Sequence, residues 1–171
     1  GKLSGWIGYT LAWNNRQFSA LKEGRAFPYR YDRRHDLSIV AIYELSKKIN
    51  VSSTWVYGTG NAVTLPKSRY GAIVSGENLD YSYLTNVEQY GDRNSYRMNA
   101  YHRLDIGINF IKTRKNRTRT WSIGAYNAYA NNNPFFVYFD TDYLDTGVEK
   151  RVLKQVSLFP LIPYVTYSLK F

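Results

Sequence analysis

Apolar and polar residues alternate over much of this chain, most clearly in its last stretch, 156–171 (VSLFPLIPYVTYSLKF). Counting back from Phe171 to Pro163, every second residue is apolar or aromatic, and the residues between them are mostly polar. A period of two gives a β-strand one apolar face and one polar face. In a soluble sheet the apolar face turns inward, whereas in a membrane barrel it turns outward to lipid and the polar face lines the lumen.

The same alternation recurs in five earlier segments, so the sequence predicts six antiparallel strands. Their expected ranges are 2–13, 36–45, 49–60, 101–110, 118–130 and 156–171. The connections between them run long, short, long, short, long, and the long ones cover 14–35, 61–100 and 131–155. Outer-membrane barrels keep short turns in the periplasm and long loops outside. We therefore expect the cell outer membrane as the location, with the C-terminus in the periplasm and the long loops extracellular.

Strand length and strand number refine this prediction. Ten residues that rise about 3.4 Å each, tilted by about 40°, span roughly 26 Å, which matches an apolar band of about 25 Å. Six strands are fewer than the smallest membrane barrels contain, and open strand edges are not tolerated in lipid. We expect an all-β, antiparallel, up-and-down transmembrane barrel, of which this chain is one sector that pairs with strands outside it. The residues expected to face lipid are Leu37, Ile39, Val51, Trp55, Ile106, Ile108, Trp121, Ile123, Val165, Tyr167, Leu169 and Phe171.

Composition agrees with a barrel and excludes several other classes. The 171 residues include 17 Tyr, 8 Phe and 4 Trp, yet the mean hydropathy is only −0.46. No run of 18 apolar residues is present, so a helical membrane protein is excluded, whereas a barrel strand is half polar. The absence of Cys excludes a disulfide framework. Because the chain starts at Gly1, we expect any export signal to lie upstream, in a larger protein.

Several short motifs are spread over nearly the whole chain. They are Phe27-Pro28 with 31–37 (YDRRHDL), 55–61 (WVYGTGN) with Thr64 and Pro66, 124–127 (GAYN) with Asn133-Pro134, and 157–160 (SLFP) with Pro163, Tyr167 and Phe171. With these motifs the chain resembles the C-terminal barrel of Bacteroidota TonB-dependent outer-membrane receptors, of the type with an N-terminal carboxypeptidase-regulatory-like domain. The resemblance implies a barrel of about 22 strands closed by an N-terminal plug. The implied partners are the other strands and the plug of the same barrel, TonB–ExbB–ExbD through that plug, outer-membrane lipids and, as a candidate, a surface lipoprotein.

The function expected from this resemblance is import of a scarce nutrient, namely a glycan, a peptide or a metal chelate. One alternative is a non-transporting outer-membrane barrel that serves as a scaffold for surface lipoproteins or an envelope complex. Another is a soluble, aromatic-rich β domain that binds glycans. No catalytic triad, phosphate-binding loop or pair of catalytic carboxylates stands out in the sequence, so we expect neither an enzyme nor a cofactor.

Aromatic and guanidinium side chains in the long loops are the candidate substrate-binding residues. Tyr and Arg present flat, amphipathic surfaces that suit sugars, peptides or metal chelates at the mouth of a barrel. The candidates are Tyr81, Tyr83, Arg93, Tyr96, Arg97, Phe135, Phe136 and Tyr138. The alternative is that these side chains pack the loops against one another.

Three charged or metal-binding patterns have competing interpretations. The run 32–36 (DRRHD) suits an anionic or sugar ligand, but an ion-pair network is favoured. His35 and His102 are isolated from carboxylate clusters, so no metal site is predicted there. The acidic run 140–147 resembles a calcium loop but lacks two of its ligands, so turn chemistry explains it better.

Basic residues gather in the two short turns. One turn has Lys112, Arg114, Lys115, Arg117 and Arg119, and the other has Lys47 and Lys48. Cations beside aromatic residues also suit nucleic acid. Here Tyr and Trp lie at strand ends, as at a membrane interface, which favours contact with anionic phospholipid headgroups. No nucleic-acid partner is expected.

Overall fold

The computed structural model of this chain is all-β and describes residues 1–74, 83–143 and 147–171. Helical structure in these ranges is limited to the short 3-10 turn η1 (Lys22–Gly24). No helix in the described part of the chain is long and apolar enough to cross a membrane. The chain forms two compact units, the first made of 1–12, 33–60 and 99–171 and the second of 13–32 and 61–98.

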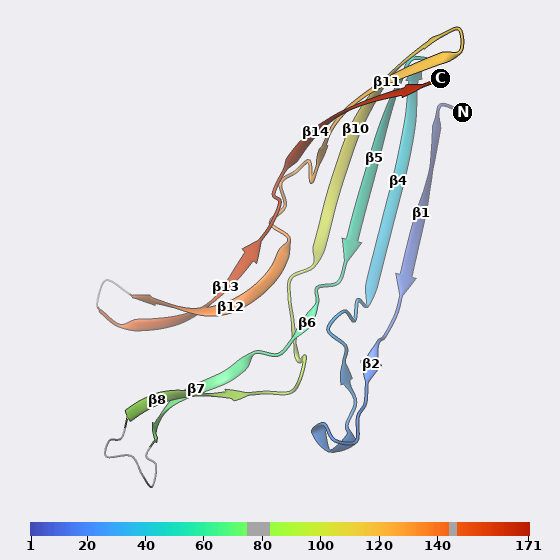
Figure 1. Ribbon diagram of the computed structural model, residues 1–171. Helices are drawn as coiled ribbons and strands as arrows, with labels where there is room; N and C mark the ends of the chain where they lie inside the picture. Colours follow the sequence, from blue (N-terminus) through green and yellow to red (C-terminus); the bar gives the residue numbers. More distant parts are fainter. Residues whose placement is uncertain (75–82, 144–146) are drawn as a thin grey trace. The chain divides into compact units, whose positions relative to one another are not determined.

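The first unit is built on a six-stranded antiparallel sheet with the order β1-β4-β5-β10-β11-β14 (Figure 1). Its strands are β1 (Leu3–Leu11), β4 (His35–Ser46), β5 (Ile49–Gly58), β10 (Tyr101–Arg114), β11 (Arg117–Tyr126) and β14 (Ile162–Lys170). The short β4–β5 and β10–β11 turns lie at one end of the sheet, and the three long connections leave from the other end. All six predicted strands are present, and β1 and β14 form the two edges of this sheet.

Strand register places the predicted apolar residues on one face of the sheet. Val51 is opposite Ile108, Ile108 is opposite Ile123, and Ile123 is opposite Val165. Cross-strand partners point to the same face and successive residues to opposite faces, so this row of four spans β5, β10, β11 and β14. The row formed by Ile7, Ile39, Trp55 and Leu104 lies on the same face nearer the other end of the sheet.

In the described part of the chain, the apolar face of the sheet is largely exposed. Ile7 is 71% exposed, Val165 64% and Ile123 49%. The only buried hydrophobic side chains in the described part of the chain are Phe27, Ala62 and Met98, and all three belong to the second unit. The sheet therefore has no hydrophobic core of its own among these residues.

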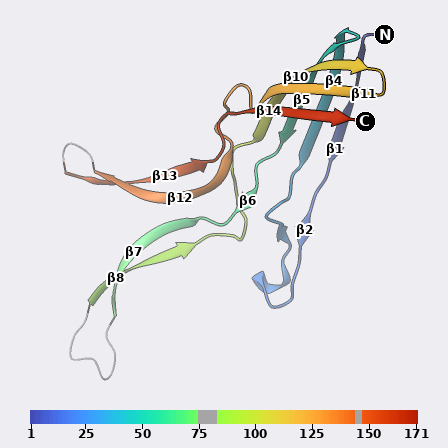
Figure 2. The same cartoon turned by 45° about the horizontal axis from the view of Figure 1, so that its top comes forward.

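The long connections contain two well-formed hairpins that the sequence did not predict. In the predicted loop 61–100, β7 (Pro66–Val74) pairs with β8 (Tyr83–Tyr90). In and just after the predicted loop 131–155, β12 (Pro134–Tyr143) pairs with β13 (Glu149–Ser157) (Figure 2). Pairing within each hairpin satisfies backbone groups that an irregular loop would leave to water.

The last strand also begins later than predicted. Pairing to β11 starts at Ile162, not at residue 156, because Val156 and Ser157 pair with β12. The proline-containing segment 158–161 separates the two strands. Proline cannot donate a ladder hydrogen bond, so Pro160 suits this break.

The second unit is held together by short strand pairs and a small core. β2 (Asn15–Arg16) pairs with β3 (Phe27–Pro28), and β6 (Ala62–Val63) pairs with β9 (Tyr96–Arg97). Backbone bonds add to these pairs, with Ala62 N donating to Arg30 O at 2.9 Å. Segments far apart in the sequence are thereby joined into one unit.

Candidate functional site

The candidate binding residues fall into two groups. Phe135, Phe136 and Tyr138 lie on β12 in the first unit. Arg93, Tyr96 and Arg97 lie in the second unit. Tyr81 lies outside the described residues, and of Tyr83 the structure describes only the backbone position at the start of β8. The two groups therefore belong to different units.

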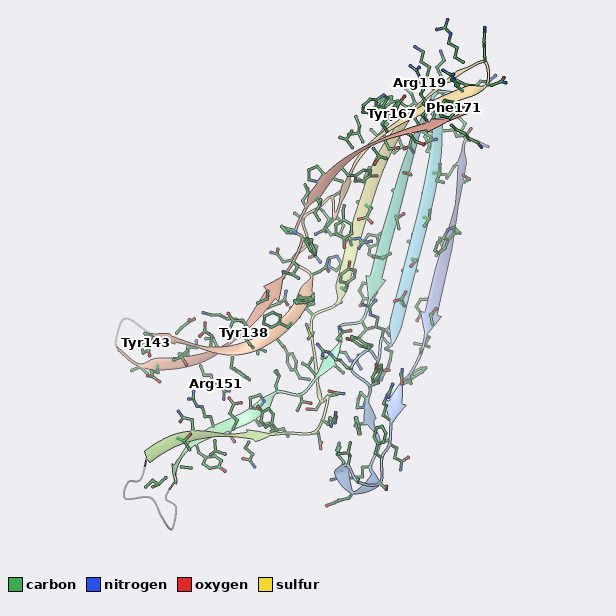
Figure 3. All side chains as sticks on the ribbon, viewed as in Figure 1. Arg119, Tyr138, Tyr143, Arg151, Tyr167 and Phe171 are labelled. Atoms are coloured by element: carbon green, nitrogen blue, oxygen red, sulfur yellow. The ribbon has the colours of Figure 1, made fainter. Side chains whose placement is uncertain are left out.

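The three aromatic residues of β12 form an exposed ladder. The ring centroids of Phe135 and Phe136 are 5.8 Å apart, and those of Phe136 and Tyr138 are 5.9 Å apart. Phe135 is 59% exposed, and the other two rings are also exposed. Tyr138 is labelled on this hairpin in Figure 3. Such a surface suits the apolar faces of sugar rings or flat chelates.

Lys154, Asp140 and Asp142 form a charged cluster beside the aromatic ladder, here called the Lys154 clip. Lys154 is the cross-strand partner of Tyr138, and its Nζ donates to Asp140 Oδ2 and Asp142 Oδ1, both at 2.8 Å. The hydrogen bond from Lys154, followed by one from the backbone N–H of Thr141, lowers the pKa of the Asp140 carboxyl. The same two carboxylates raise the pKa of Lys154. The hairpin thus pairs a stacking surface with a charged group of one cation and two carboxylates.

The opposite face of the same hairpin carries a cation–π pair. The Arg151 guanidinium lies 4.1 Å from the centre of the Phe139 ring. Register places Arg151 opposite Thr141, on the face that does not carry Tyr138. Arg151 and Tyr138 are both labelled in Figure 3. The Arg151–Phe139 contact lies on one face of β12, and the aromatic ladder on the other face stays accessible to a ligand.

A small pocket of about 160 Å³ lies where β12 leaves the sheet. Phe135 and Tyr126 are two of its walls, and Arg103 lies beside it. The Arg103 guanidinium donates to the hydroxyls of Tyr101, at 2.9 Å, and Tyr126, and it pairs with Asp105 at 2.9 Å. Arg103, Tyr101 and Tyr126 were not among the predicted binding residues. The sequence feature that could have indicated them is the charged Arg-x-Asp pattern on the polar face of a predicted strand.

Asn127, just after β11, is bonded to the segments that precede β12 and β14. Asn127 is only 1% exposed, and its Nδ2 donates to Asn131 O at 2.9 Å and to the carbonyls of Phe159 and Pro160. Its own backbone N–H donates to Asp105 Oδ1 at 3.0 Å. The 124–127 motif therefore ties the β11 end to the segment that leads into β14.

In the second unit, Arg97 is committed to a buried carboxylate. Its Nη2 lies 2.6 Å from Asp32 Oδ2, and Asp32 is 1% exposed. The backbone N–H of Asn14 donates to the other oxygen of Asp32 at 2.7 Å. This geometry gives Arg97, a candidate binding residue, a structural partner instead of an open guanidinium face.

Arg93 and Tyr96 remain near the surface of the second unit. The Arg93 guanidinium lies 5.3 Å from the centre of the Phe27 ring, and Tyr96 is 38% exposed. Arg93 also lines an open hollow of about 380 Å³ with Lys22 and Asp92, which are 3.1 Å apart. Lys22 donates to the Asp92 carboxyl and lowers its pKa.

The run 32–36 forms ion pairs, as the favoured interpretation predicted. Arg33 Nη1 lies 3.5 Å from Asp36 Oδ2, in addition to the bond between Asp32 and Arg97. The His35 ring shares a hydrogen bond of 2.8 Å with the Tyr9 hydroxyl. The His102 ring does the same with Tyr129, also at 2.8 Å. The Nδ1 atom of each histidine therefore already has a hydrogen-bond partner within the protein.

No family model, curated protein or solved structure matches this chain. What it does must therefore be argued from its own faces and side chains. Two of these stand out: the uncovered apolar face of the sheet and the exposed aromatic ladder of β12.

Proposed function

We propose that this chain is the C-terminal sector of a TonB-dependent outer-membrane receptor that imports a glycan, a peptide or a metal chelate. One observation carries the proposal: a continuous apolar face, with Ile7 and Val165 among its most exposed members, lies on a sheet with two open edges. In this proposal lipid covers the face, and further strands of the same barrel pair with β1 and β14.

Energetics support a lipid cover for this face. Fully burying one Val, Leu or Ile side chain contributes about 1.5–3 kcal/mol. A domain has only about 5–15 kcal/mol of net stability. Burying a row of four such as Val51-Ile108-Ile123-Val165 would therefore contribute about as much free energy as the whole net stability of a typical domain.

The opposite face has the chemistry of a water-filled lumen. Asn109 Nδ2 donates to Asn50 Oδ1 at 2.7 Å across β5 and β10. Ser122, the cross-strand partner of Asn109, extends this polar row into β11. Arg103 and Asp105 lie on the same face nearer the end from which the long connections leave. Alternation of this kind supports a barrel wall with lipid on one side and water on the other.

Substrate recognition is proposed for the β12 ladder of Phe135, Phe136 and Tyr138. The rings are exposed, they contact one another in sequence, and the Lys154 clip beside them supplies polar atoms. A scaffold function is the second candidate. The same exposed aromatic ladder favours it, because a surface lipoprotein could dock there as well as a small nutrient.

The full-length protein in its host tests these proposals. It should fractionate with the outer membrane, and deleting the TonB-binding segment expected upstream should abolish growth on the imported nutrient while the receptor remains in the membrane. Continued import without that segment would contradict TonB-dependent transport. A lipoprotein complex that survives the deletion, in a strain whose nutrient import does not change, would favour the scaffold. Purification without detergent, and absence from outer-membrane fractions, would favour a soluble glycan-binding domain.

A further inference from the structure

The β10–β11 hairpin ends in a cluster of five cations, here called the turn cluster. It consists of Lys112, Arg114, Lys115, Arg117 and Arg119. All five side chains are exposed, and with Asn116 they line an open hollow of about 580 Å³. None of the five has an ion-pair partner within 1–74, 83–143 and 147–171.

Strand register places four of these cations in directly opposed pairs. Lys112 is directly opposite Arg119, and Arg114 is directly opposite Arg117. Like charges at directly opposed positions destabilise a sheet. Both pairs lie on the apolar face, because Lys112 follows Phe110 by two residues and Arg119 precedes Trp121 by two. A bound anion would relieve this repulsion.

The protein offers no nearby carboxylate side chain to neutralise the cluster. The sequence has no Asp or Glu between Asp105 and Asp140. The strands on either side of the hairpin, β5 and β14, have none either. The Arg117 guanidinium lies 5.3 Å from the centre of the Phe171 ring, so the carboxylate of Phe171 is the one protein anion beside the cluster among the described residues. The other cations are left to solvent ions or to an external anionic ligand.

An aromatic row lies directly beside the cluster on the same face. Phe110 is opposite Trp121, Trp121 is opposite Tyr167, and the rings of the last two are 4.9 Å apart. Tyr167 lies at the same end of the sheet as Arg119, as Figure 3 shows. Trp and Tyr concentrate where a membrane meets water. The face thus passes from aliphatic rows to aromatic rings to cations.

From this order we infer that the turn cluster binds the phosphate of an anionic phospholipid. The acyl chains of that lipid extend over Phe110, Trp121 and Tyr167. The inference rests on the proposed membrane location, which supplies lipid to this face. A nucleic acid would use the cations and stack on the exposed rings, but it would leave the aliphatic rows beyond them uncovered, so lipid fits all three features.

The test uses the full-length receptor in detergent micelles, with phosphatidylglycerol and phosphatidylcholine as probes and native mass spectrometry as the readout. The variant Lys112→Gln/Arg119→Gln removes two opposed cations, and Lys47→Gln/Lys48→Gln removes the same charge from the other short turn. At about fivefold per cation, the first variant should lower the preference for phosphatidylglycerol by about 30-fold. The second should lower it much less. An equal loss in both variants would reveal a general charge effect and overturn the site.

A second measurement does not depend on the charge variants folding. Brominated phosphatidylglycerol should quench Trp121 fluorescence, identified by its loss in Trp121→Phe, more strongly than brominated phosphatidylcholine does. Equal quenching by the two lipids would contradict the inference. So would displacement of phosphatidylglycerol by equimolar inorganic phosphate, or tighter binding of a single-stranded oligonucleotide.

Failure of the inference can be told apart from failure of the proposed function. A receptor that does not enter the outer membrane overturns the membrane proposal, and the lipid site with it. A receptor that inserts and imports, yet holds phosphatidylglycerol equally well with and without Lys112 and Arg119, overturns only the lipid site.

Discussion

Tyr164 lies across Gly124, its cross-strand partner on β11. A Cβ atom added at Gly124 would lie 2.5 Å from the Tyr164 hydroxyl oxygen, and one added at Gly107 on the next strand would lie equally close to it. The tyrosine side chain therefore covers two glycines on the polar face. Aromatic cover of glycine compensates for the missing side chain and fixes strand register.

This contact predicts that Gly124→Ala destabilises the sheet. The new methyl group would meet the Ile106 carbonyl as well as Tyr164, and overpacking of this kind typically costs about 1–3 kcal/mol. The matched control is Gly71→Ala on β7, where a Cβ has no neighbour within 4 Å. The free energy of unfolding in detergent, measured with urea, should fall for the first variant and stay level or rise slightly for the second. Equal effects would contradict the packing.

The bond between Asp32 and Arg97 predicts that Arg97→Gln loosens the second unit. Removing the guanidinium leaves a carboxylate that is 1% exposed without its cation, which typically costs about 3–5 kcal/mol. Hydrogen exchange should then quicken in 13–32 and 61–98 but not in β10 or β11. Restored protection in Arg97→Gln/Asp32→Asn would confirm that the pair is structural. Unchanged protection in the single variant would support a ligand-binding role for Arg97 instead.

The Lys154 clip predicts how the β12–β13 hairpin responds to pH. The pKa of Asp140 is lowered, so its contribution is present above about pH 4 and is lost as the pH falls through the lower folded-state value. The pKa of Lys154 is raised, so its contribution is present below about pH 10 and is lost as the pH rises through the higher folded-state value.

Spin labels at the opposed positions Tyr143 and Glu149 can measure this response. Their distance distribution should be narrow between about pH 5 and 10 and should broaden below about pH 4. The variant Lys154→Gln should remove most of the dependence. A distribution that broadens identically in the variant would show that the clip does not hold the hairpin closed.

The aromatic ladder predicts loss of import on truncation. Phe136→Ala and Tyr138→Ala should each lower the apparent affinity for the imported nutrient by about two- to tenfold, as expected for lost ring stacking. Tyr143→Ala is the control, because this 72% exposed ring lies on the other face of β12 and makes no ladder contact. Uptake is measured with the nutrient that a receptor-deletion strain cannot use. Equal effects at all three positions would argue against the ladder.

Much of the sheet follows from the sequence because each of its strands has a clean period of two. The predicted range 49–60 became β5 (Ile49–Gly58), and 101–110 became the longer β10 (Tyr101–Arg114). Two of the four extra residues of β10, Lys112 and Arg114, are charged, and the strand character of this stretch comes from pairing with β11 instead of from an apolar pattern. Hairpin β12–β13 was missed for the same reason, since charged residues such as Lys150 and Lys154 interrupt its alternation.

The site was harder to predict than the strands. Pairing of Asp32 with Arg97 joins residues 65 positions apart, and no local pattern encodes it. The role of Arg103 is not encoded locally either, because its bond to the Tyr126 hydroxyl depends on the pairing of β10 with β11. The β12 aromatics were predicted as binding residues because aromatic residues in a polar segment stand out by composition. The structure adds that their rings are exposed, and their binding role stays a prediction.

The orientation of the two faces can be measured directly. This chain has no cysteine, so once any cysteine elsewhere in the full-length receptor is replaced, a nitroxide can be placed singly at Ile123 or at the adjacent Ser122 of the receptor reconstituted in lipid vesicles. The account predicts that the label at 123 collides readily with oxygen and poorly with a water-soluble nickel chelate, and that the label at 122 shows the reverse. A label at 123 that is shielded from oxygen, or that is open to the nickel chelate, would contradict the lipid-facing sheet.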